Sequence, residues 1–224
     1  VRYTGTPFYF MVNHIREKPG KISFFQFEGS VGSIRSKEFE GGDSPSRYLQ
    51  PRLSSYWNEI TYSNLSLLKE DSKSKWWLGA SISNLINVRY SPRWDNSAIN
   101  YDVSGNLQAE ARYQREFEIF GKKMKGVFAL KIPLIGYMTR PIYAGVPDFL
   151  DQERGFENQL FENTSVSWIG NFPRIQFDNY IEFPIAGGNK IQLIYNWEYY
   201  SYQDPANVQT AGHTIGINFL MRTK

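Results

Sequence analysis

The most regular feature of the chain is a strict alternation of apolar and polar positions in the stretch "NYDVSGNLQAEARYQREFEIFGKK", from Asn100 to Lys123. One file of alternate residues runs from Tyr101 to Tyr113 and is apolar or small. The other file contains no apolar member. Alternation with a period of two is typical of a β-strand with two unlike faces. The stretch is far longer than the usual five or six residues of a strand.

Similar period-two segments follow one another along the whole chain, and helical periodicity is nearly absent. The alternation changes phase near Pro173, where we expect a break because proline lacks a donor for the strand ladder. It is mixed within Arg47–Lys69, where a bulge would explain the change of phase between Trp57 and Ile60. We count nine segments: Pro7–Lys18, Lys21–Arg35, Arg47–Lys69, Trp76–Tyr90, Asn100–Lys123, Met124–Leu134, Gln159–Ile185, Lys190–Gln203 and the last one, which contains Ile215–Met221.

The connections between these segments are alternately short and long. The short ones are "EKPGK", "KEDSKSK", "FGKK" and "AGGNK", and the long ones include Arg140–Asn158. This is typical of up-and-down hairpins with one short-turn rim and one long-loop rim. Ten of the twelve lysines lie at short turns or at the C-terminus, and only Lys37 and Lys131 do not. Charge is expelled from a lipid-facing belt, so this distribution favours a membrane barrel.

Alternation alone does not say which face points inward. A water-soluble barrel of the lipocalin kind would bury the apolar file, and a membrane barrel would expose it to lipid. Long strands, aromatic residues such as Trp76 and Tyr90 near strand ends, and the lysine-rich rim favour the membrane. We therefore predict one domain, residues 1–224, folded as an up-and-down antiparallel transmembrane β-barrel of about ten strands, within a range of about eight to twelve.

The even number matters because a closed antiparallel barrel usually needs one. We expect the partner missing from the nine counted segments in residues 1–6, in Arg47–Lys69, in the segment around Pro173, or outside the given chain.

Composition narrows the function. The net charge of +3 and the lack of a basic tract argue against a nucleic-acid partner. The absence of cysteine excludes disulfides, cysteine-type zinc sites and thiol nucleophiles. Two histidines, His14 and His213, are too few for a multi-histidine metal site. We predict no cofactor. No apolar run approaches the roughly 18 residues of a transmembrane helix, which argues against a helical membrane protein.

The last segment, "GHTIGINFLMRTK", resembles the terminal strand that small outer-membrane β-barrels of Gram-negative bacteria present to their assembly machinery. It departs from their common pattern by ending in Arg222, Thr223 and Lys224 and not in an aromatic residue. The tyrosine-rich, long-loop style is similar to that of Bacteroidota proteins. The resemblance implies a bacterial outer-membrane location in contact with lipid, with short turns in the periplasm and long loops outside the cell.

If the polar files face inward, they bring acids and bases together inside the barrel. Because buried charges must be paired, we expect a packed, self-neutralising lumen without a large pore. Glu116, Glu118 and Glu198 belong to the same inward files. The expected lumen charge network consists of Glu28, Arg89, Asp102, Glu110, Arg112, Lys125, Lys131, Arg174, Asp178 and Glu182.

We predict that the chain is not an enzyme but a structural or accessory subunit that contacts other outer-membrane proteins, or a surface-loop binding scaffold. One alternative is a barrel-embedded hydrolase, a lipid-modifying enzyme or a protease. Against it, neither histidine is part of the His-x-Ser arrangement that would place a base beside a hydroxyl. The other is a soluble, lipocalin-like ligand-binding barrel. The candidate partner-binding loop lies within Thr139–Gln159 and contains Tyr143, Pro147, Phe149, Leu150 and Phe156.

Overall fold

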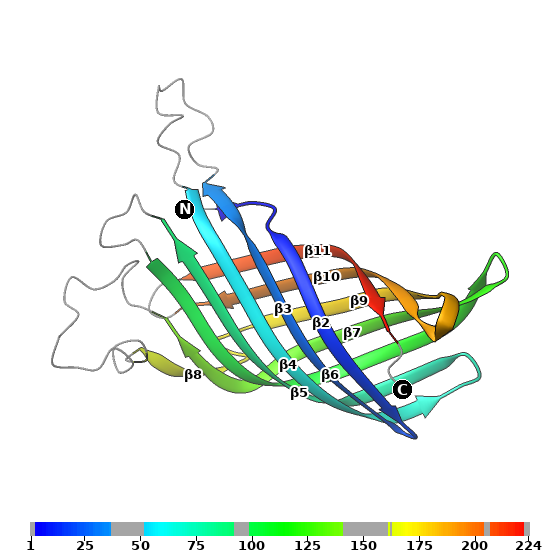
Figure 1. The fold of residues 1–224 in the computed structure, drawn as a ribbon. Helices are drawn as coiled ribbons and strands as arrows, with labels where there is room; N and C mark the ends of the chain where they lie inside the picture. Colours follow the sequence, from blue (N-terminus) through cyan, green and yellow to red (C-terminus); the bar gives the residue numbers. More distant parts are fainter. Residues whose placement is uncertain are drawn as a thin grey trace.

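The computed structural model describes residues 3–36, 52–91, 99–140, 161, 163–203 and 207–221. Within these residues eleven strands form one antiparallel sheet (Figure 1), which confirms the all-β antiparallel prediction. The elements are β1 (Tyr3–Thr4), β2 (Phe8–Lys18), β3 (Lys21–Ser36), β4 (Arg52–Glu70), β5 (Ser74–Tyr90), β6 (Ile99–Ile119), β7 (Lys122–Thr139), β8 (Thr164–Trp168), β9 (Arg174–Pro184), the 3-10 turn η3 (Ala186–Gly188), β10 (Lys190–Tyr202) and β11 (Val208–Leu220).

The eleven strands of the described chain occupy nine positions in the sheet. β1 and β2 both pair with β3, and β8 and β9 both pair with β7. The order is otherwise the chain order, from β1 and β2 at one edge to β11 at the other. Nine lies within the predicted range but is one fewer than the ten expected. The described parts of the suspected segments add no tenth position: β1 continues the line of β2, β8 continues that of β9, and residues 52–69 lie in the single strand β4.

The break expected near Pro173 is present. β8 ends at Trp168 and β9 begins at Arg174. Between them, the Phe172 N–H donates to the Trp168 carbonyl at 2.8 Å, so the chain turns locally in place of continuing the ladder. The carbonyl of Pro173 accepts a hydrogen bond from the Ser201 N–H at 3.0 Å. The proline therefore lies where the ladder is already interrupted and no donor is needed.

An irregularity lies within the expected segment Arg47–Lys69, but it does not fall between Trp57 and Ile60 and does not cause the mixed alternation. The β3–β4 pairing is regular from Arg52 to Ser66, and the register shift of β4 against β5 lies between Leu67 and Lys69. The alternation looks mixed because β4 carries apolar residues on both faces: Trp57 points inward and Ile60 outward.

The short turns all lie at one end of the sheet, on the right in Figure 1. They comprise Pro19–Gly20, Asp71–Lys73, Phe120–Gly121 and Ile185–Asn189, and we call this end the short-turn rim. The Phe120–Gly121 turn has positive φ at both residues, 51° and 72°. Such a two-residue turn matches the natural twist of the hairpin strands. Most residues of the connections at the opposite end lie outside the described part of the chain.

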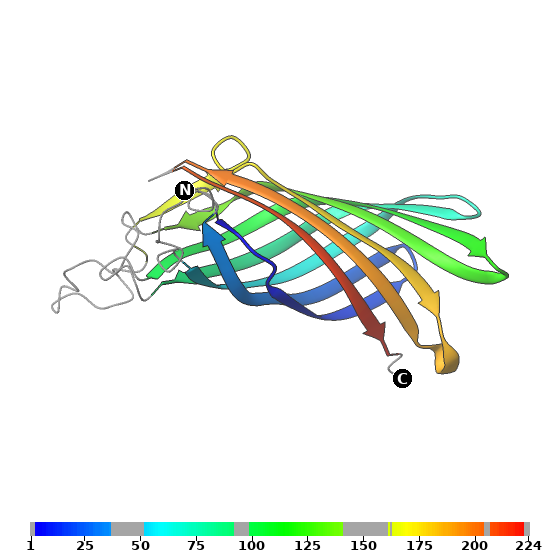
Figure 2. The same cartoon turned by 90° about the horizontal axis from the view of Figure 1, so that it is seen from above.

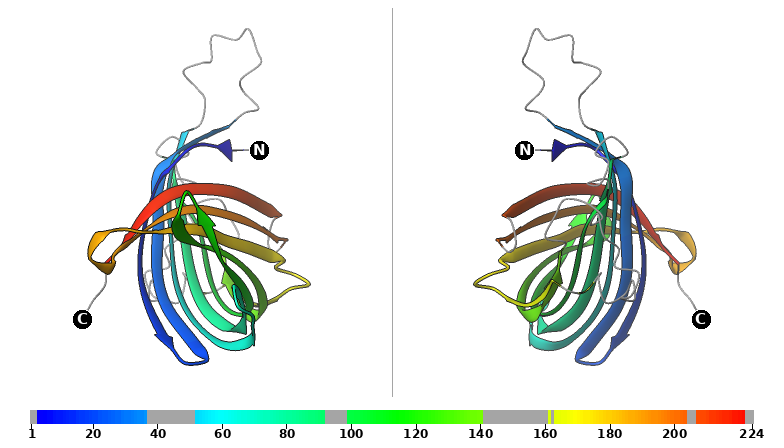
Figure 3. Two further views of the ribbon diagram at one scale, coloured as in Figure 1. Left: turned by 90° about the vertical axis from the view of Figure 1, so that its right-hand side faces the viewer. Right: turned by 90° about the vertical axis from the view of Figure 1, so that its left-hand side faces the viewer.

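The sheet curls around a central axis, as the end-on views in Figure 3 and the view from above in Figure 2 show. Side chains from strands far apart in the sheet order therefore meet inside. Asn87 of β5 donates to Tyr200 of β10 at 3.3 Å, and the Arg112 guanidinium of β6 lies 4.0 Å from the Phe24 ring of β3. No backbone pairing joins the edge strands β2 and β11, which are both fully described. The sheet is thus barrel-like with one open seam.

The two faces of the sheet are sorted by polarity. On β6, Asp102, Gln108 and Glu110 are completely buried, whereas Leu107 between them is 41% exposed. The same alternation of burial runs along β4 and β5; the exposed outward file is mostly apolar on β5 and mixes apolar residues such as Ile60 with polar ones such as Asn64 on β4. The polar files therefore form the interior and the apolar files the outer surface.

Two apolar clusters flank the charged part of the interior. One contains Ile22, Phe24, Leu65 and Trp77 and lies toward the short-turn rim. The other contains Met138, Phe172, Tyr200 and Tyr202 and lies toward the opposite end. Along the strands, charged residues such as Glu28 on β3 and Glu198 on β10 lie between the two clusters. Many of the interior charges thus lie between the two clusters.

Candidate functional site: the charged interior

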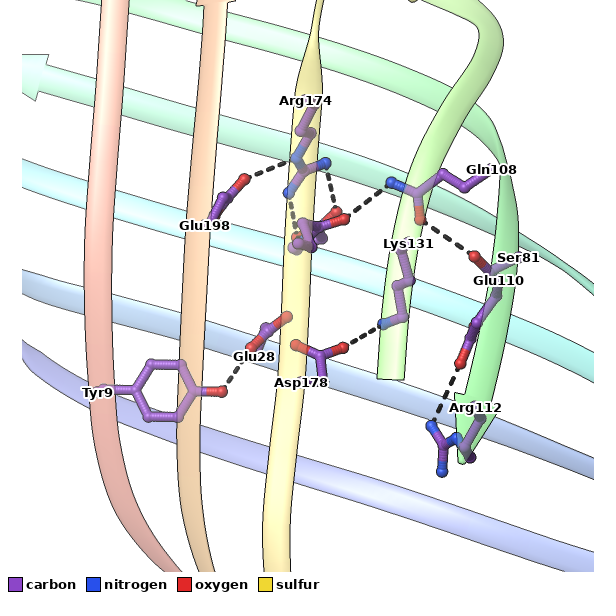
Figure 4. A network of polar contacts seen from close by, with 12 residues as sticks. Tyr9, Glu28, Ser81, Gln108, Glu110, Arg112, Lys131, Arg174, Asp178 and Glu198 are labelled. Carbon is purple, nitrogen blue, oxygen red and sulfur yellow. Dashed lines mark hydrogen bonds and ion pairs between the residues drawn. The ribbon is translucent and has the colours of Figure 1, made fainter. Parts of the chain in front are cut away.

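The middle of the interior is organised around the guanidinium of Arg174, the first residue of β9, which is completely buried. Its two terminal nitrogens donate to both carboxylate oxygens of Glu59 at 2.8 and 2.6 Å. Its Nε donates to Glu198 at 2.6 Å (Figure 4). The planar fork of arginine matches a carboxylate in this two-bond geometry. One cation therefore holds two acids, one from neighbouring β10 and one from β4 across the interior.

Amide and hydroxyl side chains extend this centre toward β5. Gln176 donates to Glu59 at 3.2 Å and accepts from Gln108 at 2.9 Å, and Ser81 donates to Gln108 at 3.1 Å. These groups satisfy hydrogen-bonding capacity that burial would otherwise leave unmet. The chain of contacts links β9 through β6 to β5, so it also ties opposite walls together (Figure 4).

A second set of charges lies beside the first, toward the short-turn rim. Lys131 is almost fully buried and its ammonium lies 2.7 Å from Asp178. Tyr9 donates to Glu28. Arg112 lies 3.3 Å from Glu110 on its own strand and stacks over Phe24. Lys131 is directly opposite Glu110 in the β6–β7 register.

Two further ion-pair groups lie beyond this middle region. Toward the long-loop end, Asp102 is bound by Arg89 at 2.5 Å and by Arg140 at 2.7 Å. Toward the short-turn rim, Glu182 is bound by Lys125 at 3.3 Å and Lys190 at 2.8 Å.

The interior of the described sheet is therefore close to electrically neutral. Its acids are Glu28, Glu59, Asp102, Glu110, Asp178, Glu182 and Glu198, and its bases are Arg89, Arg112, Lys125, Lys131, Arg140 and Arg174. A charge-selective channel is usually lined by a ring of one sign. The mixture observed here suits internal pairing and packing instead.

All ten residues of the expected lumen network face the interior, and Glu198 does too. Arg89, Lys125 and Lys131 each bind an acid. Glu116 and Glu118, expected in the same file, are exposed instead, because β6 extends to the short-turn rim where the inward file meets solvent.

Three important interior residues were not anticipated from the sequence: Glu59, Tyr9 and Arg140. Glu59 lies in the segment of mixed alternation, which obscured its face. Tyr9 stands between the outward-facing Phe8 and Phe10, so the alternation does place it inward. Arg140 follows directly after β7, where no periodic pattern assigns a direction.

The two histidines lie outside this network. His14 and His213 are on exposed outward positions of β2 and β11, and the Tyr195 hydroxyl lies 2.9 Å from His213 Nδ1. The candidate partner-binding residues Tyr143, Pro147, Phe149, Leu150 and Phe156 lie outside the described residues.

Two hollows open beside the network. The first is small and partly open, and it is lined by Asn13 of β2, Arg112 of β6 and Asn196 of β10, among others. The second opens at the short-turn rim, and its lining includes Lys18, Lys75 and Lys190 together with Glu70, Glu116 and Trp77. Both are lined by a mixture of polar and apolar side chains.

Comparison with known protein families and with curated proteins found no match. Among the described residues no helix is long and apolar enough to cross a membrane. The same residues contain no cluster of three or more histidine, cysteine, aspartate or glutamate side chains that could hold a metal ion.

Proposed function

We propose that the protein is an integral outer-membrane β-barrel whose charged interior is a structural filling, and that it serves as an accessory subunit or surface-loop scaffold for other outer-membrane proteins. The observation that carries the proposal is the inverted burial of the sheet. Thirty-three large hydrophobic side chains of the described residues are exposed, whereas thirteen hydrophobic residues are buried. Proteins in water rarely expose contiguous apolar surface on this scale.

The distribution of aromatic residues supports contact between the outer face of the sheet and a lipid bilayer. Trp76 and Tyr113 form an outward pair with ring centroids 4.6 Å apart toward the short-turn rim. Tyr56 and Tyr90 are exposed on β4 and β5 toward the other end. Tryptophan and tyrosine prefer the interface between lipid and water, and membrane barrels carry girdles of them at both levels.

The paired interior supports a structural or interactive role over transport. The Arg174 and Lys131 ion pairs bridge the middle of the interior and the apolar clusters lie on both sides of them. A conducting pore would need a continuous polar passage through this region. The functional surfaces of the protein are then the rims, loops and edges of the barrel.

The test is the behaviour of the purified protein toward water and lipid. A membrane barrel is extracted only with detergent, inserts into lipid vesicles and changes its gel mobility on heating. A stable monodisperse protein in detergent-free buffer would contradict the proposal and favour the soluble ligand-binding barrel. The hydrolase alternative predicts lipid or peptide cleavage that is lost in His14→Ala or His213→Ala.

A further inference from the structure

The two edge strands of the sheet, β2 and β11, run in the same direction. β2 ends at Lys18 beside the Pro19–Gly20 turn, and β11 ends at Leu220, opposite Lys190 after the η3 turn. Both therefore run toward the short-turn rim (Figure 1). Neighbouring strands of an antiparallel sheet alternate in direction, so the strands at the first and ninth positions must run the same way.

Closing the sheet by pairing β2 directly with β11 would create one parallel pair in an otherwise antiparallel sheet. Parallel pairing is slightly less stable per residue, and single-chain bacterial barrels have even strand numbers. The structure makes no such pairing: β2 and β11 come within 8 Å over a short stretch only and cross at an angle (Figure 1). One strand running the opposite way would pair antiparallel with both edges.

The interior beside the seam has room for the side chains of such a strand. Gly212 and Gly216 of β11 face inward, and a Cβ added at either one would meet no atom within 4 Å. At Gly79, an inward glycine of β5 in the middle of the sheet, an added Cβ would lie 2.1 Å from the Asn64 carbonyl oxygen. Among the strand glycines of the described chain, only these two on β11 have such open space.

The first of the two hollows lies inside the curled sheet next to the edge strand β2, and residues of β3, β6, β9 and β10 complete its lining. Two buried polar atoms of its lining residues have no hydrogen-bond partner within the described part of the chain: Nε of Arg112, a donor, and Oδ1 of Asn196, an acceptor. Arg112 is only 5% exposed. Buried polar groups normally find partners. An inward side chain that both accepts and donates, such as an amide, would supply them.

We propose that the seam accepts one extended strand of a partner protein, antiparallel to both β2 and β11, which completes a ten-position barrel. Its outward side chains are apolar and its inward side chains are polar. The proposal rests on the membrane-barrel function proposed above and names the surface through which the subunit docks. A second copy in the same membrane orientation does not fit, because its free edges run in the same direction as β2 and β11.

Strand addition requires the edges to part slightly. Two neighbouring strands stand about 4.7–4.9 Å apart, so an interposed strand needs about 10 Å between β2 and β11. Backbone hydrogen bonds along both edges would compensate for the movement, as in other cases of strand addition to sheet edges.

The test places a photoreactive phenylalanine derivative at outward positions of the full chain in native membranes. Ala211 and Phe219 sample the two ends of β11, and Phe8 and His14 sample β2. Ile82, outward on β5 in the middle of the sheet, is the matched control. Peptide mapping of the cross-linked products then identifies what was captured and in which order.

We expect the photoreactive group at each of the four edge positions to cross-link to one segment of one partner protein, which gives a gel shift. The group at Ile82 should give no such shift. Because the added strand runs from the short-turn rim upward, the peptide captured at Phe219 precedes that captured at Ala211, and the peptide at His14 precedes that at Phe8. Direct β2–β11 cross-links, the reverse order, capture of a second copy, or no capture would each overturn the inference. The membrane proposal fails separately, if the protein is absent from the membrane fraction.

Discussion

Arg174 and Glu59 form a two-bond ion pair across the interior, with distances of 2.8 and 2.6 Å, although 115 positions separate them and β9 and β4 are not neighbours in the sheet. The pair is completely buried. Each charged group is removed from water, so its burial is tolerated only because the opposite charge lies beside it. The contact also connects β4 and β9 across the interior of the curled sheet.

Replacing Arg174 by methionine should strongly destabilise the protein. The substitution leaves the carboxylates of Glu59 and Glu198 buried without their cation, and breaking a buried pair in this way costs about 3–5 kcal/mol. The measurement is the free energy of unfolding in urea, followed by tryptophan fluorescence in detergent or vesicles.

The triple variant Arg174→Met, Glu59→Gln and Glu198→Gln is the control. It removes all three charges together, so we expect it to recover at least half of the loss, because uncompensated charge is the main penalty. A single variant that costs less than about 1 kcal/mol, the value of an exposed pair, would show that water reaches this site.

Glycine positions offer a second test, based on close packing of the sheet. A Cβ at Gly105 would lie 2.3 Å from the ring of Tyr137 on the neighbouring strand. Gly105→Ala must displace that ring, and we expect a loss of about 1–3 kcal/mol in the free energy of unfolding. Gly216→Ala meets open space and should change it by less than about 1 kcal/mol. Equal effects would contradict the open seam.

The Phe120–Gly121 turn is a third test. Phe120 is 98% exposed and has a φ of 51°, a conformation that costs non-glycine residues roughly 1–2 kcal/mol but suits asparagine. Phe120→Asn loses no buried contact and should raise the free energy of unfolding by up to about 1 kcal/mol. Gly121→Ala, at a φ of 72°, should lower it by about 1 kcal/mol. A destabilising Phe120→Asn would indicate that the ring has a partner.

The sequence predicts the strands better than the way they assemble. The period of two places Glu110 and Lys131 on inward files because a strand has only two faces. It also locates the interruption at Pro173, since proline has no N–H to donate. The face of Glu59 was hidden, because its inward file contains the apolar Leu53 and Trp57 and the outward file contains the polar Asn58.

Contacts across the interior could not be predicted from periodicity. Pairing between adjacent hairpin strands follows from the chain order, but the meeting of Arg174 with Glu59 depends on the curl of the whole sheet. The strand number falls within the expected range of eight to twelve, but the even count expected of a closed barrel is not met: the described sheet has nine positions and remains open between β2 and β11. Parity is a property of closure, and no local pattern records whether a sheet closes on itself.

The last prediction tests whether lipid or water surrounds the outer face of the sheet. Ile82 points outward at the middle of β5 and is 55% exposed. If lipid surrounds it, Ile82→Arg places a cation near the bilayer midplane and should lower the free energy of unfolding in vesicles by about 2–4 kcal/mol. Ile119, also outward but at the short-turn rim, is the matched position, where the cost of arginine falls to about 0–1 kcal/mol. In water both substitutions would be nearly neutral, so small and equal effects would contradict the membrane proposal.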